Sequence, residues 1–382
     1  MTPPSGDRAL ARLLTQSVIG VSGEPLGPEV RAVPVETVIA AGGDHRVTPA
    51  LARRVGSAPD APREWADRLA PHRTLQLMRH MQASGDLRRI AEVFAHAGIA
   101  WAVGKGPVAA DLIWPSPDMR EYYDLDVFVG RGDFAAALDE LLAAGCTLVD
   151  RNWPELSRSM RAEIGLLGPA GTHIDLHWDM AVPPKLRRAF RTDMAGMLGR
   201  ARPARLGSGV AVSVFDPVDT VVHLVFHAAQ AGANRLMWIA DIHHATAQPG
   251  FDWAEFARRT AAARTTVASA LVLDRVSRTL GFRNPPPAAV LAPASSVWGR
   301  LARERDERYA FPGLPGDRHQ GGTLFSSARE HLAASALDAA VASWRVRATE
   351  RRITRGADER ILRRDVPDAA SRTAYLEAVA GV

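Results

Sequence analysis

The chain has 382 residues, of which 47% are hydrophobic and 23% charged, so it is long enough for two or three globular domains. No apolar run reaches the ~18 residues that a membrane-spanning helix needs. Residues 1–20 also lack the basic and apolar segments of a signal peptide. A single cysteine, Cys146, excludes an internal disulfide framework and a multi-cysteine zinc site. We therefore expect a cytoplasmic protein.

The net charge of +5 is modest for this length. Only two of the 47 basic residues are lysines, Lys105 and Lys185, and the rest are arginines. Such arginine usage, together with abundant alanine and proline, is typical of a biased overall composition and is not by itself a sign of nucleic-acid binding. A lysine at an unusual position is therefore conspicuous.

The first part of the chain, residues 1–85, is predicted to be helical or irregular. Proline, glycine and serine interrupt short apolar patches over residues 1–60, which we expect to be irregular apart from one helix over residues 7–17. The apolar spacing over residues 63–80 is helical.

Residues 86–215 alternate between predicted helices and strands. Gly98 is expected to end a helix over residues 86–97. Further helices are predicted over residues 108–113, 132–144 and 184–198, and strands over residues 99–103, 124–129, 146–149, 164–167, 172–178, 202–206 and 210–214. This order predicts an α+β fold, in which a mixed sheet core is flanked by helices.

The last part, residues 216–382, is predicted to form an all-helical C-terminal domain. Its helices are expected over residues 218–231, 236–247, 253–263, 265–280, 326–355 and 369–379. The proline-rich residues 284–287 and the glycine- and proline-rich residues 311–322 are predicted to be loops or linkers.

Two acids share one face of the strand predicted over residues 124–129. Side chains alternate along a strand, so Asp124 and Asp126 lie on one face and Leu125, Val127 and Val129 on the other. Close like charges raise each other's pKa unless a cation lies between them. Paired carboxylates suit Mg²⁺ or Mn²⁺. The alternative is a strand face whose two acids simply point into water.

A third acid, Asp175, lies in the middle of the strand predicted over residues 172–178, on one face with His173 and His177. Because its strand neighbours are apolar and expected to be buried, the charge of Asp175 must be compensated by a partner. A metal shared with Asp124 and Asp126 would compensate it, as in two-metal phosphoryl transfer. The third carboxylate could also accept the proton of the nucleophile.

The turn Gly104-Lys105-Gly106 lies between a predicted strand and a predicted helix, where backbone N–H groups can bind phosphate. It lacks the P-loop spacing, and an ordinary structural turn is the alternative. His223 and His227 have metal-ligand spacing on a predicted helix, but without an HExxH motif we favour structural or phosphate-facing roles.

Residues 345–364 contain eight arginines and three acids. This segment could bind RNA or another phosphate-rich partner. The alternative, which we favour, is a solvated helix face.

Taken together, these motifs resemble the bacterial family of uncharacterised nucleotidyltransferases, a branch of the DNA-polymerase-β-like superfamily. The resemblance covers about residues 70–250. It is carried by the Gly-Lys-Gly turn at 104–106, Arg120 four residues before the DLDVFV strand at 124–129, the HIDLHW strand at 173–178, and the histidines, Arg235-Leu236, Trp238 and Asp241 that follow.

The resemblance implies a transferase that moves a nucleoside monophosphate, expected to be AMP, from an NTP to an acceptor and releases pyrophosphate. Asp124, Asp126 and Asp175 would hold Mg²⁺ or Mn²⁺. Gly104, Lys105, Gly106 and Arg120 would contact or neutralise the phosphates, with Lys105 or the backbone replacing the serine of the superfamily's Gly-Ser turn.

The acceptor is expected to be a small molecule or a peptide, and neither DNA nor a membrane is expected as a partner. Two alternatives stay open. One is a toxin-like enzyme that adds nucleotides to tRNA, and the other is a non-catalytic nucleotide-binding partner protein.

Overall fold

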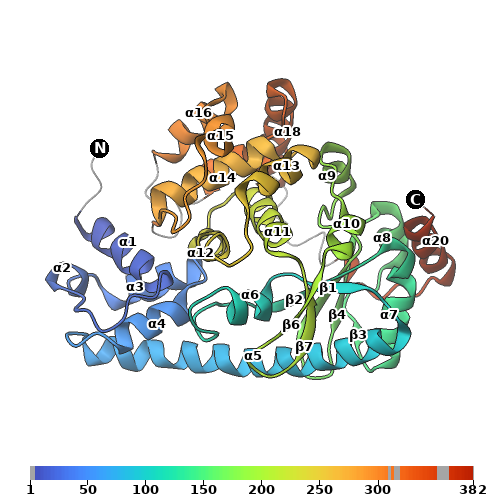
Figure 1. Ribbon diagram of the computed structural model, residues 1–382, viewed down its shortest axis with the longest axis horizontal. Helices are drawn as coiled ribbons and strands as arrows, with labels where there is room; N and C mark the ends of the chain where they lie inside the picture. Colours follow the sequence, from blue (N-terminus) through green and yellow to red (C-terminus); the bar gives the residue numbers. More distant parts are fainter. Residues whose placement is uncertain (1–4, 309–310, 314–318, 351–360, 382) are drawn as a thin grey trace.

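The structure is a computed structural model that describes residues 5–308, 311–313, 319–350 and 361–381. Its centre is a seven-stranded mixed sheet with the order β3-β4-β5-β2-β1-β7-β6 (Figure 1). The strands are β1 (Trp101–Val103), β2 (Asp124–Val129), β3 (Thr147–Leu148), β4 (Glu163–Leu167), β5 (His173–His177), β6 (Arg202–Arg205) and β7 (Ala211–Val214). The predicted α+β fold, with a mixed sheet flanked by helices, is confirmed.

Helices surround this sheet and continue on both sides of it in the sequence. The N-terminal helices are α1 (Ser5–Val18), α2 (Pro28–Arg31), α3 (Val35–Asp44), α4 (Thr48–Gly56) and α5 (Arg63–Ala97). Those between the strands are α6 (Gly106–Leu112), η1 (Arg131–Asp133), α7 (Phe134–Ala143), α8 (Trp153–Ser159), α9 (Pro184–Ala189) and α10 (Met194–Gly199). Those after the sheet are α11 (Pro217–Gln230), α12 (Leu236–Ala245), α13 (Trp253–Ala262), α14 (Thr266–Thr279), α15 (Ala288–Leu291), η2 (Ala292–Ser295), α16 (Val297–Asp306), α17 (His319–Ser326), α18 (Leu332–Glu350) and α20 (Ala369–Ala380).

Apolar side chains form two hydrophobic cores. One lies under the sheet, where Leu125 and Val127 of β2 and Leu176 of β5 are fully buried. The other joins the N-terminal helices to the helices that follow the sheet, and Leu51 and Val221 are among its members. Figure 1 shows α5 running along the bottom of the molecule, beneath the N-terminal helices and the sheet. The α11 helix lies over the opposite face of the sheet, where Phe128 of β2 contacts His223 of α11 with ring centroids 5.1 Å apart.

Several elements differ from the sequence-based expectation. Residues 19–60, predicted to be irregular, contain the helices α2, α3 and α4, because prolines at or just before their first turns start short helices whose apolar faces are buried. The helix over residues 7–17 is confirmed. Residues 63–97 form one continuous helix that ends at Gly98, whose φ of 68° suits a C-cap glycine.

The single helix predicted over residues 184–198 is two helices, since Asp193 caps the start of α10 by accepting from the Gly196 N–H at 2.9 Å. The predicted helix over residues 326–355 is interrupted between α17 and α18, and residues 351–360 lie outside the described part of the chain. The loop predicted over residues 311–322 contains the start of α17.

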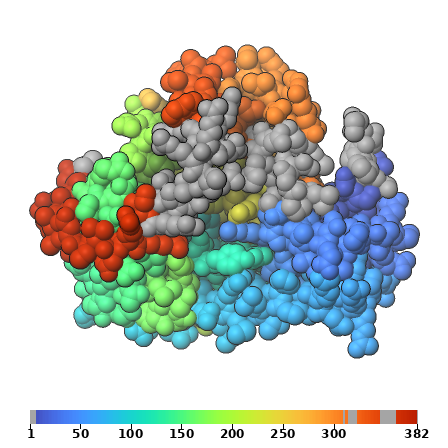
Figure 2. Space-filling view, turned by 180° about the vertical axis from the view of Figure 1, so that it is seen from behind, coloured from blue at the N-terminus to red at the C-terminus, as the bar shows by residue number. Residues whose placement is uncertain are grey.

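The C-terminal helix α20 returns to the α/β part of the chain. The Tyr375 hydroxyl donates to the Arg161 carbonyl at 2.7 Å and accepts from Trp178 Nε1 at 3.1 Å. Figure 2 shows this end of the chain against the segment that contains β4 and α8. The division of the chain into three domains at residues 85 and 215 stays a prediction. The α5 helix crosses the first of these boundaries, and α20 of the third part packs on α8 of the second. Over the described residues, no helix has the length and apolarity needed to cross a membrane.

Candidate functional site

A cavity of about 490 Å³ opens over the polar face of the sheet, between β2, β5 and α11. Residues of α9, α17 and α18 complete its wall. Its lining consists of Lys105, Asp124, Asp126, Phe128, Glu163, Asp175, His177, Met180, Val182, Pro183, Lys185, Leu186, His223, Phe226, His227, Gln230, Ser326, Ser327, Arg329, Asp338 and Ala342. Both lysines of the chain therefore lie at this cavity.

Strand register brings the three predicted acids together. The β2 and β5 strands are parallel neighbours, with Asp126 opposite Asp175 and Asp124 opposite His173. Because side chains of paired residues lie on the same face of a sheet, all three carboxylates face the cavity. The one-residue alternation that buries Leu125 and Val127 is thus also what presents the acids.

His177 joins this group of acids. Ligand atoms of Asp126, Asp175 and His177 lie within 4.8 Å of one another, which is close enough for a shared metal ion. His177 Nε2 is 3.3 Å from Asp126 Oδ1, and its Nδ1 is 3.6 Å from a carboxylate oxygen of Glu163. Asp124 lines the same cavity beside this cluster.

The carboxylates have strongly different proton affinities. Burial, followed by the charge of Glu163, raises the pKa of Asp175 well above its ordinary value. Burial and the charge of Asp126 also raise the pKa of Asp124. Burial opposes ionisation of Asp126 too, but Lys105 and His177 outweigh it and hold the pKa of that carboxyl well below its ordinary value. Crowded acids of this kind are typical of functional sites.

The donor set fits a divalent metal. Asp126 Oδ2 is buried, and the described part of the chain offers it no hydrogen bond. A buried carboxylate oxygen without a partner is costly, and a cation would satisfy it. Oxygen-rich sites with one imidazole bind first-row divalent metals. The cluster could therefore hold a metal ion.

The Gly104-Lys105-Gly106 turn lies directly against β2. The Gly104 N–H donates to the Asp126 carbonyl at 2.9 Å. A Cβ atom on Gly104 would lie 2.9 Å from a ring carbon of Phe128, and one on Gly106, whose φ is +56°, would lie 3.0 Å from the Asp124 carbonyl oxygen. Both positions therefore require glycine.

Lys105 links the acids to α11. Its Nζ lies 3.2 Å from Asp126 Oδ1 and 3.1 Å from His227 Nδ1. Burial and the nearby ammonium lower the pKa of His227 well below its ordinary value and that of His223 to about 3, so both rings are neutral at physiological pH. A neutral His227 can accept a hydrogen bond from Lys105. Both histidines thus face the cavity, one turn apart on α11.

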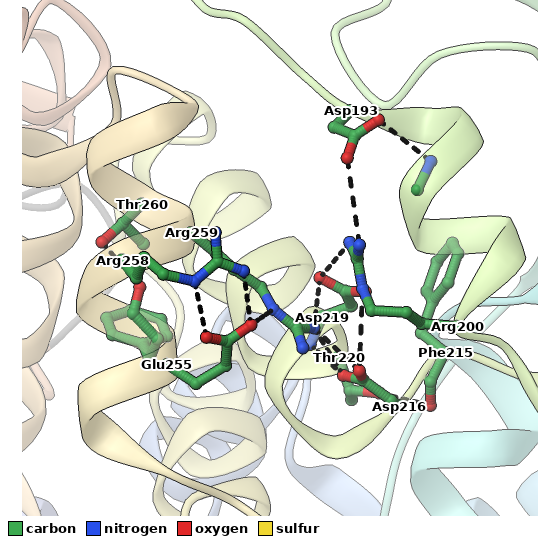
Figure 3. A network of polar contacts seen from close by, with 12 residues as sticks. Asp193, Arg200, Phe215, Asp216, Asp219, Thr220, Glu255, Arg258, Arg259 and Thr260 are labelled. Atoms are coloured by element: carbon green, nitrogen blue, oxygen red, sulfur yellow. Dashed lines mark hydrogen bonds and ion pairs between the residues drawn. The ribbon is translucent and has the colours of Figure 1, made fainter.

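A polar network fixes the N-terminus of α11. Asp216 caps the helix by accepting from the Asp219 N–H at 2.7 Å. Arg200 and Arg259 each contact both of these acids, and Glu255 contacts Arg259 (Figure 3). The network ties α11 to α10 and α13, and so holds the helix that carries both histidines over the sheet.

Arg120 lies beneath the turn. Its side chain is 2% exposed and binds Asp241 of α12 through two contacts of 2.7 and 2.8 Å. A third nitrogen donates to the Gly106 carbonyl at 3.4 Å. Burial disfavours the charged guanidinium, but Asp241 outweighs burial and raises the pKa of Arg120. The structure therefore places Arg120 as a support of the turn, and its expected contact with phosphate stays a prediction that this arrangement does not favour.

Other cavity residues were not predicted. His177 could have been inferred, because strand alternation places it on the face of Asp175. Glu163 gave no signal, since its position depends on the antiparallel pairing of β4 with β5. The wall formed by residues 326–342 comes from a region that carries no recognisable motif. The arginine-rich residues 345–364 lie largely outside the described residues or have side chains that the structure does not describe.

Neighbouring strands of a mixed sheet thus present clustered carboxylates beside a glycine turn, an arrangement that could hold a metal ion. The model of the uncharacterised nucleotidyltransferase family matches residues 32–281, and the chain belongs to this family. It is therefore a nucleotidyltransferase, with an NTP as substrate. No curated protein matches the chain.

Proposed function

We propose that this protein transfers a nucleoside monophosphate, expected to be AMP, from an NTP to a nucleophile of a small molecule or peptide, with release of pyrophosphate. The observation that supports this most strongly is the convergence of Asp124, Asp126 and Asp175 in one cavity beside Lys105. The family supports nucleotidyl transfer in general.

Asp124, Asp126 and Asp175 would hold Mg²⁺ or Mn²⁺, which when bound neutralises phosphate charge and favours in-line displacement. Lys105 is proposed to contact the phosphates, since its ammonium already lies in the cavity. The backbone of Gly104 and Gly106 permits the phosphates to approach closely. Arg120 is proposed to act through the turn, by holding the Gly106 carbonyl and Asp241.

Asp175 is proposed to accept the proton of the attacking acceptor group. Its pKa is raised by burial and by Glu163, so its carboxylate binds a proton more readily than an ordinary aspartate. The oxygen of the acceptor would then attack the α-phosphorus, and the bond to pyrophosphate would break on the opposite side. Lys105 and His177 hold the pKa of Asp126 below its ordinary value, so this carboxylate is proposed to stay ionised beside Asp175.

The acceptor is proposed to bind against the far wall of the cavity. That wall contains apolar residues of the segment after β5 and of α11, such as Leu186 and Phe226, and polar residues of the segment 326–342. A cavity of this size and mixed lining suits a small molecule or a peptide side chain. The acceptor is thus proposed to contact both the helices of residues 216–282 and the C-terminal segment that lines the cavity.

The experiment compares Asp126→Asn and Asp175→Asn with wild type. Pyrophosphate release is measured with NTP, divalent metal and a pool of small-molecule and peptide acceptors. We expect each variant to lose at least a hundredfold in rate while retaining the wild-type circular dichroism spectrum. Asp139→Asn, at an exposed acid of α7, is the matched control and should release pyrophosphate at the wild-type rate. Full activity in either site variant would refute the assignment.

A further inference from the structure

The position of His177 bears on which metal the site takes. Oxygen-only sites are expected for Mg²⁺, whereas here one ring nitrogen belongs to the same cluster as the oxygens of Asp126 and Asp175. His177 is 5% exposed, so its ring is almost completely removed from bulk water. Within the described residues, neither of its ring nitrogens makes a hydrogen bond of good geometry, although both lie near carboxylates.

The His177 ring is held in place from two sides. It stacks on Phe128, with ring centroids 4.7 Å apart and an interplanar angle of 15°, because these two residues are register partners on β2 and β5. Glu163 lies 3.6 Å from Nδ1, on the side of the ring away from Asp126. Nε2 is therefore directed toward the acids. A carboxylate behind a histidine in this way orients the ring of a metal ligand and makes it more basic.

Such a donor set discriminates between metals. Mg²⁺ is a hard cation that prefers oxygen ligands and retains its water shell. Imidazole suits first-row transition metals such as Fe²⁺, Ni²⁺ and Zn²⁺ best, and Mn²⁺, the weakest binder of that series, still accepts a ring nitrogen more readily than Mg²⁺ does. Replacing one oxygen ligand by Nε2 therefore costs Mg²⁺ more than it costs Mn²⁺.

We infer that His177 is a ligand of the divalent metal together with Asp126 and Asp175, and that the site binds Mn²⁺ in preference to Mg²⁺. This inference rests on the proposed function for the use of the metal, but not for its binding. His173 provides a matched control. It lies on the same strand and face, on the other side of Asp175, is partly exposed, and stands outside the cluster.

The test is metal binding to the full chain without nucleotide. Mn²⁺ is titrated by the loss of its free-ion electron paramagnetic resonance signal, and Mg²⁺ by competition. Wild type should bind Mn²⁺ at least tenfold more tightly than Mg²⁺. His177→Gln should lose at least tenfold in Mn²⁺ affinity and much less in Mg²⁺ affinity, whereas His173→Gln should match wild type.

A second measurement uses only wild-type protein, so it tests the ligand role of His177 even if His177→Gln fails to fold. Electron spin-echo spectroscopy of wild-type protein with bound Mn²⁺ should show coupling to an imidazole ¹⁴N nucleus. Equal affinities for the two metals, no ¹⁴N coupling, or the same loss in both histidine variants would overturn the inference. If Mn²⁺ binds as expected but no NTP yields pyrophosphate, the proposed function fails and this inference stands.

Discussion

The buried pair between Arg120 and Asp241 provides a prediction about how the glycine turn is supported. Their side chains are 2% and 1% exposed and share two contacts of 2.7 and 2.8 Å. Asp241→Asn keeps the size of the side chain, so no cavity forms, but it removes the carboxylate that pairs with the buried guanidinium, while Asp124 and Asp126 act on it only through their charge. Breaking a buried pair on one side costs about 3–5 kcal/mol.

We expect Asp241→Asn to lower the free energy of unfolding by about 3 kcal/mol, near the lower end of this range. The reason is that the amide oxygen of asparagine can still accept from Trp114 Nε1 and from Arg120. This loss corresponds to roughly a hundredfold change in the unfolding equilibrium. Urea unfolding, followed by tryptophan fluorescence, measures the loss. The control is Asp139→Asn, whose partner Arg372 forms an exposed pair with side chains 62% and 34% exposed.

The exposed control pair should cost less than about 1 kcal/mol when it is broken. The double variant Arg120→Met, Asp241→Leu should recover only part of the loss, since it removes both buried charges together but leaves Trp114 Nε1 without its acceptor. If Asp241→Asn unfolds at the same urea concentration as wild type, the reasoning about this pair is refuted.

Three further predictions concern other parts of the molecule. Gly104→Ala, whose Cβ would lie 2.9 Å from the Phe128 ring, should weaken NTP binding in calorimetry at least tenfold, whereas Gly132→Ala, which meets no described atom within 4 Å, should bind as wild type does. Burial raises the pKa of Cys146 to about 11, so only about one thiol in a thousand is ionised near pH 8. Its reaction with a chromogenic disulfide reagent should be slow in native protein and fast in concentrated guanidinium chloride, and equal rates would contradict its burial. Burial also lowers the pKa of His244 to about 4, below the ~6.5 of a histidine in an unfolded chain. As the pH drops, the unfolded chain therefore binds this proton before the folded chain does. The free energy of unfolding thus falls between about pH 6.5 and pH 4. Urea unfolding should show that His244→Gln removes about 2–3 kcal/mol of that fall, and an unchanged pH profile would show that its ring is not buried as a neutral group.

The strands and most helices of the α/β part could be predicted because local patterns determine them. The alternation in the DLDVFV and HIDLH segments fixes both a strand and the face that its acids occupy. Gly98 marked the end of a helix for a similarly local reason. The short helices over residues 28–56 could not be predicted, because their apolar faces are buried only by packing against helices far away in the sequence.

The candidate site was predictable only in part. Asp124, Asp126, Asp175 and Lys105 carry recognisable motifs, and the structure brings them to one cavity. The role of Arg120 could not be judged from the sequence, because its partner Asp241 lies 121 residues later. The far wall of the cavity depends on how residues 326–342 fold back over the sheet, which no local pattern encodes.

The central claim, nucleotidyl transfer at the acids of β2 and β5, is tested most directly by the fate of two labels. Wild-type protein is incubated with Mn²⁺, acceptor pool and ATP labelled at either the α- or the γ-phosphate. We expect the α-label to move to an acceptor, the γ-label to appear in pyrophosphate, and Asp126→Asn to abolish both. A γ-label on the acceptor, with the α-label left in ADP, would contradict it.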